Sequence, residues 1–540
     1  MLKYQRAILF LLLFICLPSL WAASPLDGDW LGGFERPGSH VYVHACFVTT
    51  TNGTTGTIGV ADQGDRFTVC MDWPLDKLQL TPSRVHFELA DKPGPHSIVI
   101  RGSGPMSFEG RMTNRVITGV VDDGGKKLPF RLDLAAKIDL SRYTGNYQAA
   151  PGHFISVAPS YSPTAGWLAA SDLQSGQGGV LLPRSETDFV CGSGLKLYPV
   201  QAAIHFTTNQ LGKVTRLEWE PKNARALVAT RIKALEEKDV FFTNGDVTLA
   251  GRLVLPPTKG PHPAMVIVFG SGPWVRSDAE GFAYFFALNG MAALIYDKRG
   301  CGSSTGNPDP YKGGFDDFAG DALAGLELLK HRPDINPHQI GLWGGSEGGY
   351  VVGLAASRCA DVAFLIDAST PGITPEAVSA LQLEHFMKTA GYSKADVAEA
   401  RSLYLLCSRY ARTGSNGSEA EAARKADQNK PWYANGDLRS YFGYKESWKL
   451  TGNYDPVSAL HKVHCPVLAM FGESDPLVPA RQSAEIWKAA LTEGGNHDVV
   501  VKIFPHVNHT MADPRTDAQL PDFYALQRDW LLQHVTVGSF

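Results

Sequence analysis

The chain has 540 residues, too many for one ordinary domain, and its length predicts about three. Its composition, with 44% hydrophobic and 19% charged residues, is that of a globular protein with a sizeable core. A formal net charge of -4 gives no reason to expect a nucleic acid or an anionic membrane surface as a partner.

The first 23 residues are typical of a signal peptide. Lys3 and Arg6 form a basic segment, and residues 7–17 are an unbroken apolar run. Pro18 ends the run, and the small pair Ala22-Ala23 is suited to cleavage. The run is too short for a comfortable membrane span, and a retained N-terminal anchor is the alternative. We therefore expect an exported protein, periplasmic or extracellular, with no stable membrane span.

Export permits disulfide bonds, and seven of the eight cysteines follow residue 23. Cys46 and Cys70 lie in one small β region and are the pair that we expect to bond. Cys359 and Cys465 lie in apolar patterns and are expected to be buried free thiols. No Cys-x-x-Cys spacing occurs, so we expect no structural zinc.

The region before residue 236 is predicted to be β structure. Short alternating apolar runs recur, and clusters of Gly, Asn, Asp and Pro separate them. The runs include residues 41–43, 85–87, 115–117 and 130–132. We expect a β domain over residues 24–138 and a second small β unit over residues 139–235, each a small sandwich or an open barrel.

From residue 236 to 540 the pattern is that of an α/β domain. A hairpin is predicted around Asn244-Gly245, and apolar strands then alternate with helices. The predicted strands are 265–269, 291–296, 340–343, 363–366, 467–471 and 499–504, and the helices are 279–288, 318–329, 351–356 and 523–532. Such an alternation indicates a mostly parallel sheet covered on both faces.

The alternation stops over residues 371–460, which are predicted to be helical and polar. This insert contains a group of aromatic residues, Trp432, Tyr433, Tyr441, Phe442, Tyr444 and Trp448. It is either a cap over a functional site or a structural excursion whose aromatic residues form a core of their own. The sequence leaves both interpretations open.

Residues 344–348 read Gly-Gly-Ser-Glu-Gly, a Gly-x-Ser-x-Gly pattern between a predicted strand and a predicted helix. A serine on such a bend is held in a strained backbone conformation that exposes its hydroxyl. Gly344 and Gly348 allow the strand and the helix to pass close together. An ordinary serine is a poor nucleophile, so Ser346 also needs a base and an oxyanion site.

A glycine-rich loop after the first long strand is the expected oxyanion site. The backbone N–H of Ser271 or Gly272 can point at a developing oxyanion, and the N–H of Glu347 is the second expected donor. The side chain of Glu347 is expected to be a satisfied loop carboxylate. In the polar turn after the next strand, Asp297 and Arg299 are expected to tie loops together near the site.

Asp475 and His509 are the expected partners of Ser346. Asp475 follows a later strand and His509 follows the last one, so all three side chains should meet at the carboxyl edge of the sheet. His509 would take the proton of Ser346, and Asp475 would hold the imidazole and stabilise its charge. Glu473 competes with Asp475, and His506 competes with His509. We favour the later residue of each pair because it lies further along the loop.

These motifs together resemble the α/β-hydrolase superfamily, in particular its dienelactone-hydrolase-like and serine-aminopeptidase-like esterases. They are Gly270-Ser271-Gly272-Pro273, Asp297-Lys298-Arg299-Gly300, Gly344-Gly345-Ser346-Glu347-Gly348-Gly349 and Gly472-Glu473-Ser474-Asp475. The resemblance covers about residues 240–540 and implies a Ser346, Asp475 and His509 triad that hydrolyses acyl esters without a cofactor. One departure is Phe269, where many relatives have histidine before the oxyanion glycine.

The sequence therefore predicts an exported serine hydrolase that cleaves carboxylic esters through an acyl-enzyme intermediate. Its expected substrate is a small ester or a short peptide. One alternative is a serine peptidase or aminopeptidase of the same fold, whose leaving amine must be protonated by the histidine. Another is a binding protein on a hydrolase scaffold. The oligomeric state and the natural substrate are not predicted.

Overall fold

The computed structural model describes most of the chain after residue 23. The described residues are 24–37, 39–62, 68–81, 84–92, 98–101, 105–150, 152–159, 166–307, 313–434, 440–443, 448–515 and 518–538. The expected signal peptide over residues 1–23, and Tyr444 of the insert, lie outside them. Among the described helices, none combines the length and the apolar character that a membrane crossing requires.

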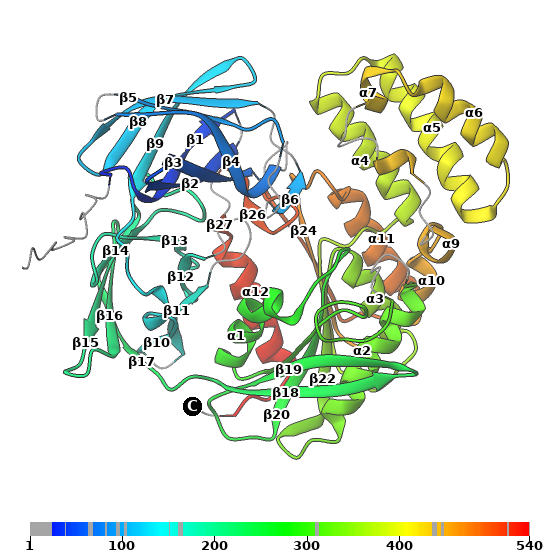
Figure 1. Ribbon diagram of the computed structural model, residues 1–540. Helices are drawn as coiled ribbons and strands as arrows, with labels where there is room; N and C mark the ends of the chain where they lie inside the picture. The colour runs from blue at the N-terminus through cyan, green and yellow to red at the C-terminus, as the bar shows by residue number, and fades with distance from the viewer. Residues whose placement is uncertain are drawn as a thin grey trace, which may run out of the picture.

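Strands β1 to β9 form an antiparallel sheet that closes on itself (Figure 1). They are β1 (Gly28–Arg36), β2 (Ser39–Thr50), β3 (Gly53–Asp62), β4 (Thr68–Thr81), β5 (Arg84–Leu89), β6 (Ile98–Arg101), β7 (Met106–Thr113), β8 (Val116–Asp123) and β9 (Lys126–Leu134). Because β1 pairs with β9 and β3 pairs with β4, eight strands form a ring, and β6 is added to β4. Alternate residues of β2 point into its core, namely Val41, Val43, Ala45 and Phe47.

Strands β10 to β17 form a second antiparallel sheet, a closed barrel. They are β10 (Gly145–Ala150), β11 (His153–Pro159), β12 (Leu168–Asp172), β13 (Gly178–Pro183), β14 (Asp188–Cys191), β15 (Ala202–Thr208), β16 (Val214–Pro221) and β17 (Leu227–Arg231). It closes because Tyr147 of β10 pairs with Arg231 of β17. The expectation of sandwiches or open barrels is therefore wrong, since the first and last strands of each unit pair with each other, which the alternation within a strand does not reveal.

The third sheet has the strand order β18-β19-β21-β20-β22-β23-β24-β25. Its strands are β18 (Glu236–Asn244), β19 (Val247–Leu255), β20 (His262–Val268), β21 (Ala292–Tyr296), β22 (Ile335–Gly345), β23 (Leu365–Ala368), β24 (Val467–Gly472) and β25 (Val499–Phe504). β19 pairs antiparallel with β18 and β21, and the pairs from β21 to β25 are parallel. The carboxyl ends of β20, β22, β23, β24 and β25 therefore share one edge.

Helices cover both faces of this sheet. They are α1 (Glu280–Leu288), which follows η2 (Arg276–Ala279), α2 (Phe315–Lys330), α3 (Glu347–Ala356), α11 (Ala480–Glu493) and α12 (Pro521–His534). Val266 of β20 packs on the side of α2, α3 and α11, whereas its neighbour Met265 packs on the side of α1 and α12. Burial on both faces is why β20 is apolar at every position after His262.

The insert between β23 and β24 has a core of its own. Its helices are α4 (Pro375–Thr389), α5 (Lys394–Thr413), α6 (Gly417–Asp427), α7 (Pro431–Ala434), η3 (Ser440–Phe442), α9 (Trp448–Thr451) and α10 (Val457–Leu460). The described members of its aromatic group are buried together with apolar residues of α4 and α5, and they are Trp432, Tyr433, Tyr441, Phe442 and Trp448. The insert also contacts the segment after β24, because Gln382 Nε2 donates to the carbonyl oxygen of Leu477 at 3.0 Å.

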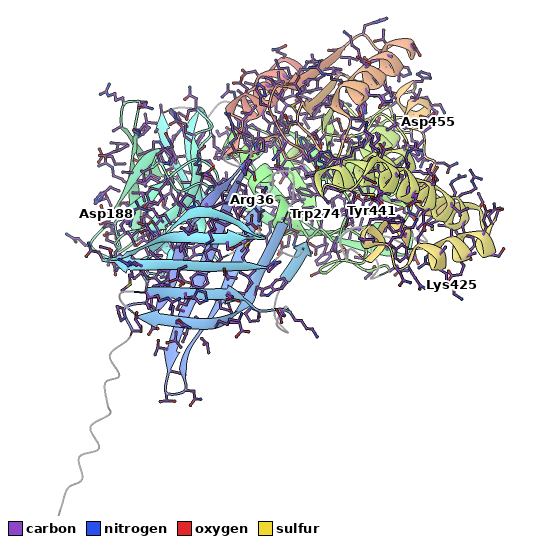
Figure 2. The ribbon with its side chains drawn as sticks, turned by 90° about the horizontal axis from the view of Figure 1, so that it is seen from above. Arg36, Asp188, Trp274, Lys425, Tyr441 and Asp455 are labelled. Carbon is purple, nitrogen blue, oxygen red and sulfur yellow. The ribbon has the colours of Figure 1, made fainter. Side chains whose placement is uncertain are left out.

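Apolar contacts join the three sheets. Leu31 and Tyr42 of the first sheet share a cluster with Trp167 and Leu182 near the barrel, and Phe154 of the barrel packs into the core of the α/β region. The first sheet and the insert lie at one end of the α/β region (Figure 1), and Trp274 lies between them in Figure 2. Each sheet lies within one range expected from the sequence, and the division into domains at those bounds stays a prediction.

The expected Cys46–Cys70 disulfide is wrong, because Cys46 is a free thiol. Cys46 of β2 is opposite Thr57 of β3, and Cys70 of β4 is opposite Val60 of β3, so β3 lies between the two cysteines. Strands two positions apart are separated by about 10 Å, beyond the roughly 7 Å Cα–Cα limit of a disulfide. Cys359 and Cys465 are free, as expected, but only half-buried.

Candidate active site

Ser346 lies at the bend between β22 and α3, with a left-handed backbone (φ 55°, ψ −123°). Such values are strained for any residue other than glycine. The bend is held by close packing, since a Cβ on Gly344 would lie 2.6 Å from the carbonyl oxygen of Gly348. A Cβ on Gly348 would lie 2.3 Å from the carbonyl oxygen of Val268. The two glycines therefore let β20, β22 and α3 approach, and the serine absorbs the strain.

Asp475 and His509 contact each other at the carboxyl edge of the sheet. His509 Nδ1 lies 2.8 Å from Asp475 Oδ2. The other carboxylate oxygen, Oδ1, accepts from the backbone N–H of Leu477 at 2.7 Å and of Val478 at 3.0 Å. Since a carboxylate only accepts, Nδ1 carries the hydrogen, and Nε2 of the neutral ring is left as an acceptor.

The environment of His509 raises its pKa. Burial by itself lowers the pKa, but the negative charge of Asp475 and the hydrogen bond to it favour the imidazolium and outweigh burial. The Asp475 side chain is only 1% exposed, against 20% for His509, so little water screens the pair. The arrangement therefore stabilises a positive charge on a ring that can accept a proton.

The two competing residues lie elsewhere. Glu473 forms an ion pair with Arg481, and 31% of its side chain is exposed. His506 is exposed and has a left-handed backbone (φ 60°). The structure therefore places Asp475 and His509 in contact and leaves Glu473 and His506 out of that pair.

The loop after β20 runs beside Ser346. A Cβ on Gly270 would lie 3.1 Å from Ser346 Cβ and 3.6 Å from Ser346 Oγ. Gly272 has a φ of 123°, which only glycine adopts readily. Ser271 Oγ donates to Glu347 Oε2 at 2.8 Å and ties the loop to the start of α3. The expected oxyanion residues are Ser271, Gly272 and Glu347. They thus lie on two segments beside Ser346, the loop after β20 and the start of α3, which a hydrogen bond joins.

Lys298 is a residue of this site that the sequence reasoning missed. Its Nζ donates to the carbonyl oxygen of Gly270 at 3.2 Å and to Glu347 Oε1 at 2.8 Å, and it lies 4.4 Å from the centre of the Phe318 ring. Only 12% of the Lys298 side chain and 21% of the Glu347 side chain are exposed. Lys298 therefore links the oxyanion loop to α3. Its position within the quoted Asp-Lys-Arg-Gly motif was the available clue.

The neighbours of Lys298 have the structural roles expected for them. Asp297 is buried and accepts from the backbone N–H groups of Arg276 and Ser303, both at 2.8 Å. The Arg299 guanidinium binds the buried carboxylate of Asp321 on α2. These bonds fix the turn that carries Lys298.

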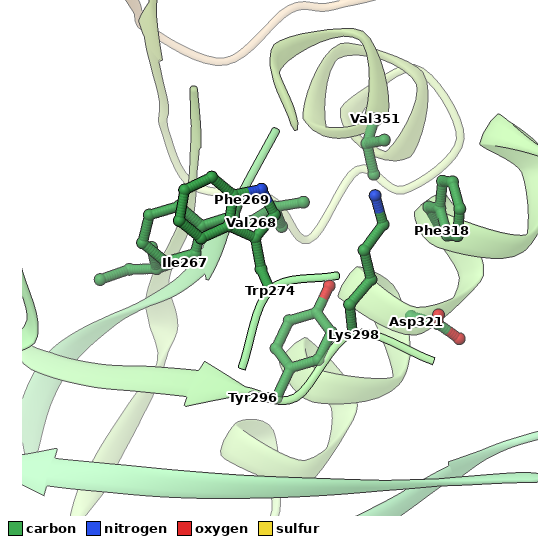
Figure 3. A pocket seen from close by; sticks show the side chains of 9 residues that line it. All are labelled: Ile267, Val268, Phe269, Trp274, Tyr296, Lys298, Phe318, Asp321 and Val351. Atoms are coloured by element: carbon green, nitrogen blue, oxygen red, sulfur yellow. The ribbon is translucent and has the colours of Figure 1, made fainter. Parts of the chain in front are cut away.

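Phe269, where histidine was expected from the resemblance, belongs to an aromatic cluster. Its ring stacks on Trp274 with centroids 5.2 Å apart, and it also contacts Trp343 at 6.3 Å. A small pocket lies beside this cluster (Figure 3). It is lined by Ile267, Val268, Phe269, Trp274, Tyr296, Lys298, Phe318, Asp321 and Val351. Stacking of Phe269 on Trp274 and the Lys298 hydrogen bond to Gly270 together support the loop.

The described residues contain no group of three or more His, Cys, Asp or Glu side chains arranged to hold a metal ion. The groups present at this edge include a hydroxyl, an imidazole–carboxylate pair and backbone N–H groups.

Comparison with known proteins links this region to hydrolytic enzymes. The family described as serine aminopeptidase, S33, matches residues 260–513. Esterase EstD of Thermotoga maritima is 26% identical over 288 residues, which are 52% of this chain and 61% of the esterase, so the match spans about three fifths of that relative. A non-heme chloroperoxidase of Burkholderia pyrrocinia is 28% identical over 272 residues, 49% of this chain and 92% of that protein.

Solved structures that resemble this chain include a Pyrococcus furiosus esterase, Pf2001. It is 17% identical, with a TM-score of 0.37, and the match covers 56% of this chain and 92% of the esterase. A proline iminopeptidase of Mycobacterium smegmatis is 19% identical, with a TM-score of 0.36, and the match covers 55% of this chain and 98% of that protein.

We predict that the imidazole of His509 titrates above its ordinary pKa of 6.5. Replacing Asp475 with asparagine removes the charge that opposes burial, so the His509 pKa should fall below its wild-type value. The raised pKa also adds stability that is complete below pH 6.5 and is lost as the pH rises through the folded-state value. NMR titration of the His509 ring protons measures the shift. The H506Q variant identifies the signals of the exposed His506 ring, because they are lost in it. An unchanged His509 pKa in D475N would contradict the assigned pair.

Proposed function

The chain belongs to the α/β-hydrolase superfamily, and from this premise we propose that it is a serine hydrolase that cleaves carboxylic esters. The observation that carries the proposal is the imidazole–carboxylate contact of His509 and Asp475 at the same sheet edge as the strained Ser346. The esterase names of two relatives support it. The apolar run and cleavage-like residues at the N-terminus support the further proposal that the enzyme is exported.

In the proposed acylation step, His509 Nε2 takes the proton of Ser346 Oγ as the oxygen attacks the ester carbonyl carbon. The carbonyl π electrons move to the oxygen, and this oxyanion accepts from the N–H of Glu347 and from that of Ser271 or Gly272. When the tetrahedral intermediate collapses, the bond to the alcohol oxygen breaks, and the leaving alkoxide takes the proton from His509. Asp475 stabilises the imidazolium throughout.

In the proposed deacylation step, water attacks the acyl-enzyme and gives its proton to His509. The second tetrahedral intermediate expels Ser346 Oγ, which recovers the proton, and the carboxylic acid leaves. No cofactor enters this cycle. The first turn of α3 supports both steps, because the N-terminus of a helix is electropositive where the oxyanion forms.

A serine aminopeptidase is the second candidate, since the matching family carries that description. An aminopeptidase needs a carboxylate to bind the ammonium group of its substrate. Two carboxylates near Ser346 and Asp475 are already engaged, Glu347 by Lys298 and Ser271 and Glu473 by Arg481. This engagement favours an ester over a peptide with a free amino terminus.

We predict that S346A reduces ester hydrolysis by at least about 10⁴-fold, because loss of a nucleophilic serine typically costs up to about 10⁶ in turnover. Hydrolysis of p-nitrophenyl acyl esters of several chain lengths measures the loss, and a fluorophosphonate should label the wild type only. S402A, which changes an exposed serine of α5, is the matched control. Undiminished hydrolysis or labelling of S346A would refute the proposed nucleophile. If S346A lost no biological activity, the binding-protein alternative would replace the enzyme.

The same enzyme should turn over a p-nitrophenyl acyl ester faster than the corresponding aminoacyl p-nitroanilide. An alkoxide leaves readily, whereas an amine leaves only after His509 protonates it. The kcat/KM values of the two substrates measure the preference. A higher value for the anilide would favour the aminopeptidase.

We predict that K298M lowers kcat by about tenfold to a hundredfold with little change in KM. The substitution frees the Gly270 carbonyl and leaves Glu347 without its cation, so the oxyanion donors lose their fixed position, at a smaller cost than the roughly 10²–10³ of a deleted donor. K298M/E347Q should recover part of the loss, because the uncompensated carboxylate is gone. K388M, on the surface of α4, is the control. A wild-type kcat in K298M would show that the link is dispensable.

A further inference from the structure

The end of β23 holds the backbone of Ser346 from two sides. The Ser346 N–H donates to the carbonyl oxygen of Ala368 at 2.8 Å, and the Ser346 carbonyl accepts from Thr370 Oγ1 at 2.7 Å. Thr370 is completely buried. A strained bend persists only where surrounding bonds fix it, so the Thr370 hydroxyl is one of the groups that determine where Ser346 lies.

Asp367, three residues before Thr370, has a carboxyl group that the proposed reaction does not use. The residue is completely buried, and neither carboxyl oxygen accepts a well-aligned hydrogen bond from the described residues. A Cβ on Gly349, in the first turn of α3, would lie 1.8 Å from Thr370 Oγ1 and 2.0 Å from Asp367 Oδ1. The hydroxyl and the carboxyl therefore fill the same space over Gly349 and are neighbours.

The surroundings of Asp367 keep its carboxyl group neutral. Burial raises the pKa of Asp367 to about 8, although the nearby Thr370 hydroxyl and the backbone N–H groups of Thr370 and Ala368 lower it in part. Its strand partners are Gly344 on β22 and Ala469 on β24, which carry no charge. The ionisable side chains of α3 are Glu347, held by Lys298 and Ser271, and Tyr350, whose own pKa is raised by burial. His509 approaches the segment through its carbonyl oxygen, which accepts from Ser369 Oγ.

We propose that Asp367 and Thr370 are positioning residues for Ser346: the neutral carboxyl of Asp367 donates its hydrogen to Thr370 Oγ1, and Thr370 donates its hydrogen to the Ser346 carbonyl. This inference rests on the proposed function of Ser346. A hydroxyl has one hydrogen to give. When Asp367 is protonated, that hydrogen is free for Ser346, and the chain of two hydrogen bonds is complete.

Loss of the Asp367 proton reverses the direction of the hydrogen bond between Asp367 and Thr370. A carboxylate is a stronger acceptor than a carbonyl oxygen, so the Thr370 hydroxyl turns to Asp367 and the Ser346 carbonyl loses that bond. The new negative charge also lies beside the first turn of α3, where it opposes the oxyanion that the Glu347 N–H binds. Both effects lower kcat, and both occur as the pH rises through the pKa of Asp367.

The test compares the pH dependence of kcat in wild type, D367N, T370V and T370S. The wild-type kcat should fall as the pH rises through about 8. In D367N the amide N–H replaces the acid O–H and cannot ionise, so the alkaline fall should disappear. T370V should lower kcat about tenfold or more at every pH with little change in KM, whereas T370S keeps the hydroxyl and should retain the wild-type profile. T492V, which removes a hydroxyl bonded to a backbone carbonyl on the surface of α11, should change nothing.

A second measurement does not depend on hydrolysis. In the S346A background, the unfolding midpoint should fall as the pH rises from about 4 to 8, because the unfolded state releases the Asp367 proton near 3.8 while the folded state keeps it to about 8. Between these values the S346A/D367N protein should lose less of its stability than S346A. The difference should stop growing above pH 8.

The two proposals fail in different ways. If S346A hydrolyses esters like wild type, the proposed function is wrong, and the unfolding measurement still reports the protonation of Asp367. If wild type depends on Ser346 but D367N keeps the alkaline fall, or T370V keeps the wild-type kcat, the positioning pair is overturned. Equal pH dependence of unfolding in S346A and S346A/D367N would also overturn it.

Discussion

The site depends on one strained residue. Ser346 has a left-handed backbone that serine adopts only at a cost of about 1–3 kcal/mol. The close packing around it holds the residue in this conformation. The glycines at 344 and 348 bring β20, β22 and α3 closer together than any side chain would permit. The compact bend projects the serine beyond the strand end and places the first N–H groups of α3 beside it. The hydroxyl and the N–H of Glu347, one of the proposed oxyanion donors, are thus fixed by the same backbone path.

The other groups of the site follow strands other than the one that carries Ser346. Asp475 and His509 follow β24 and β25, and the loop with Ser271 and Gly272 follows β20, so the parallel order of the sheet brings distant segments to one edge. Bonds between loops then complete the geometry. Lys298 joins the oxyanion loop to α3, and Thr370 and Ser369 join the end of β23 to the backbones of Ser346 and His509.

Local patterns in the sequence were enough to predict the third sheet and the residues that carry the proposed chemistry. A continuous apolar strand, a Gly-x-Ser-x-Gly bend and a carboxylate or histidine just beyond a strand are all signals within a few residues. The contacts that Lys298 makes with Gly270 and Glu347, and that Thr370 makes with Ser346, are long-range, and the Asp-Lys-Arg-Gly motif was the one local signal near any of these residues. The same limit explains the errors. Closure of the barrels depends on pairing between the first and last strands, and the Cys46–Cys70 expectation failed because β3 was not known to lie between them.

The insert has its own aromatic core, so its sequence can change separately from the residues at the sheet edge. Trp432, Phe442 and Trp448 are packed among residues of the insert itself, and Leu477, after β24, packs against this core from outside. Two hydrogen bonds that link the insert to the α/β region, from Gln382 to Leu477 and from Tyr350 to Ile373, end on backbone carbonyls, and a backbone carbonyl tolerates any side chain at its own position. Mutations can therefore remodel the insert, or replace it with another helical module, while the chemistry at the sheet edge is inherited unchanged.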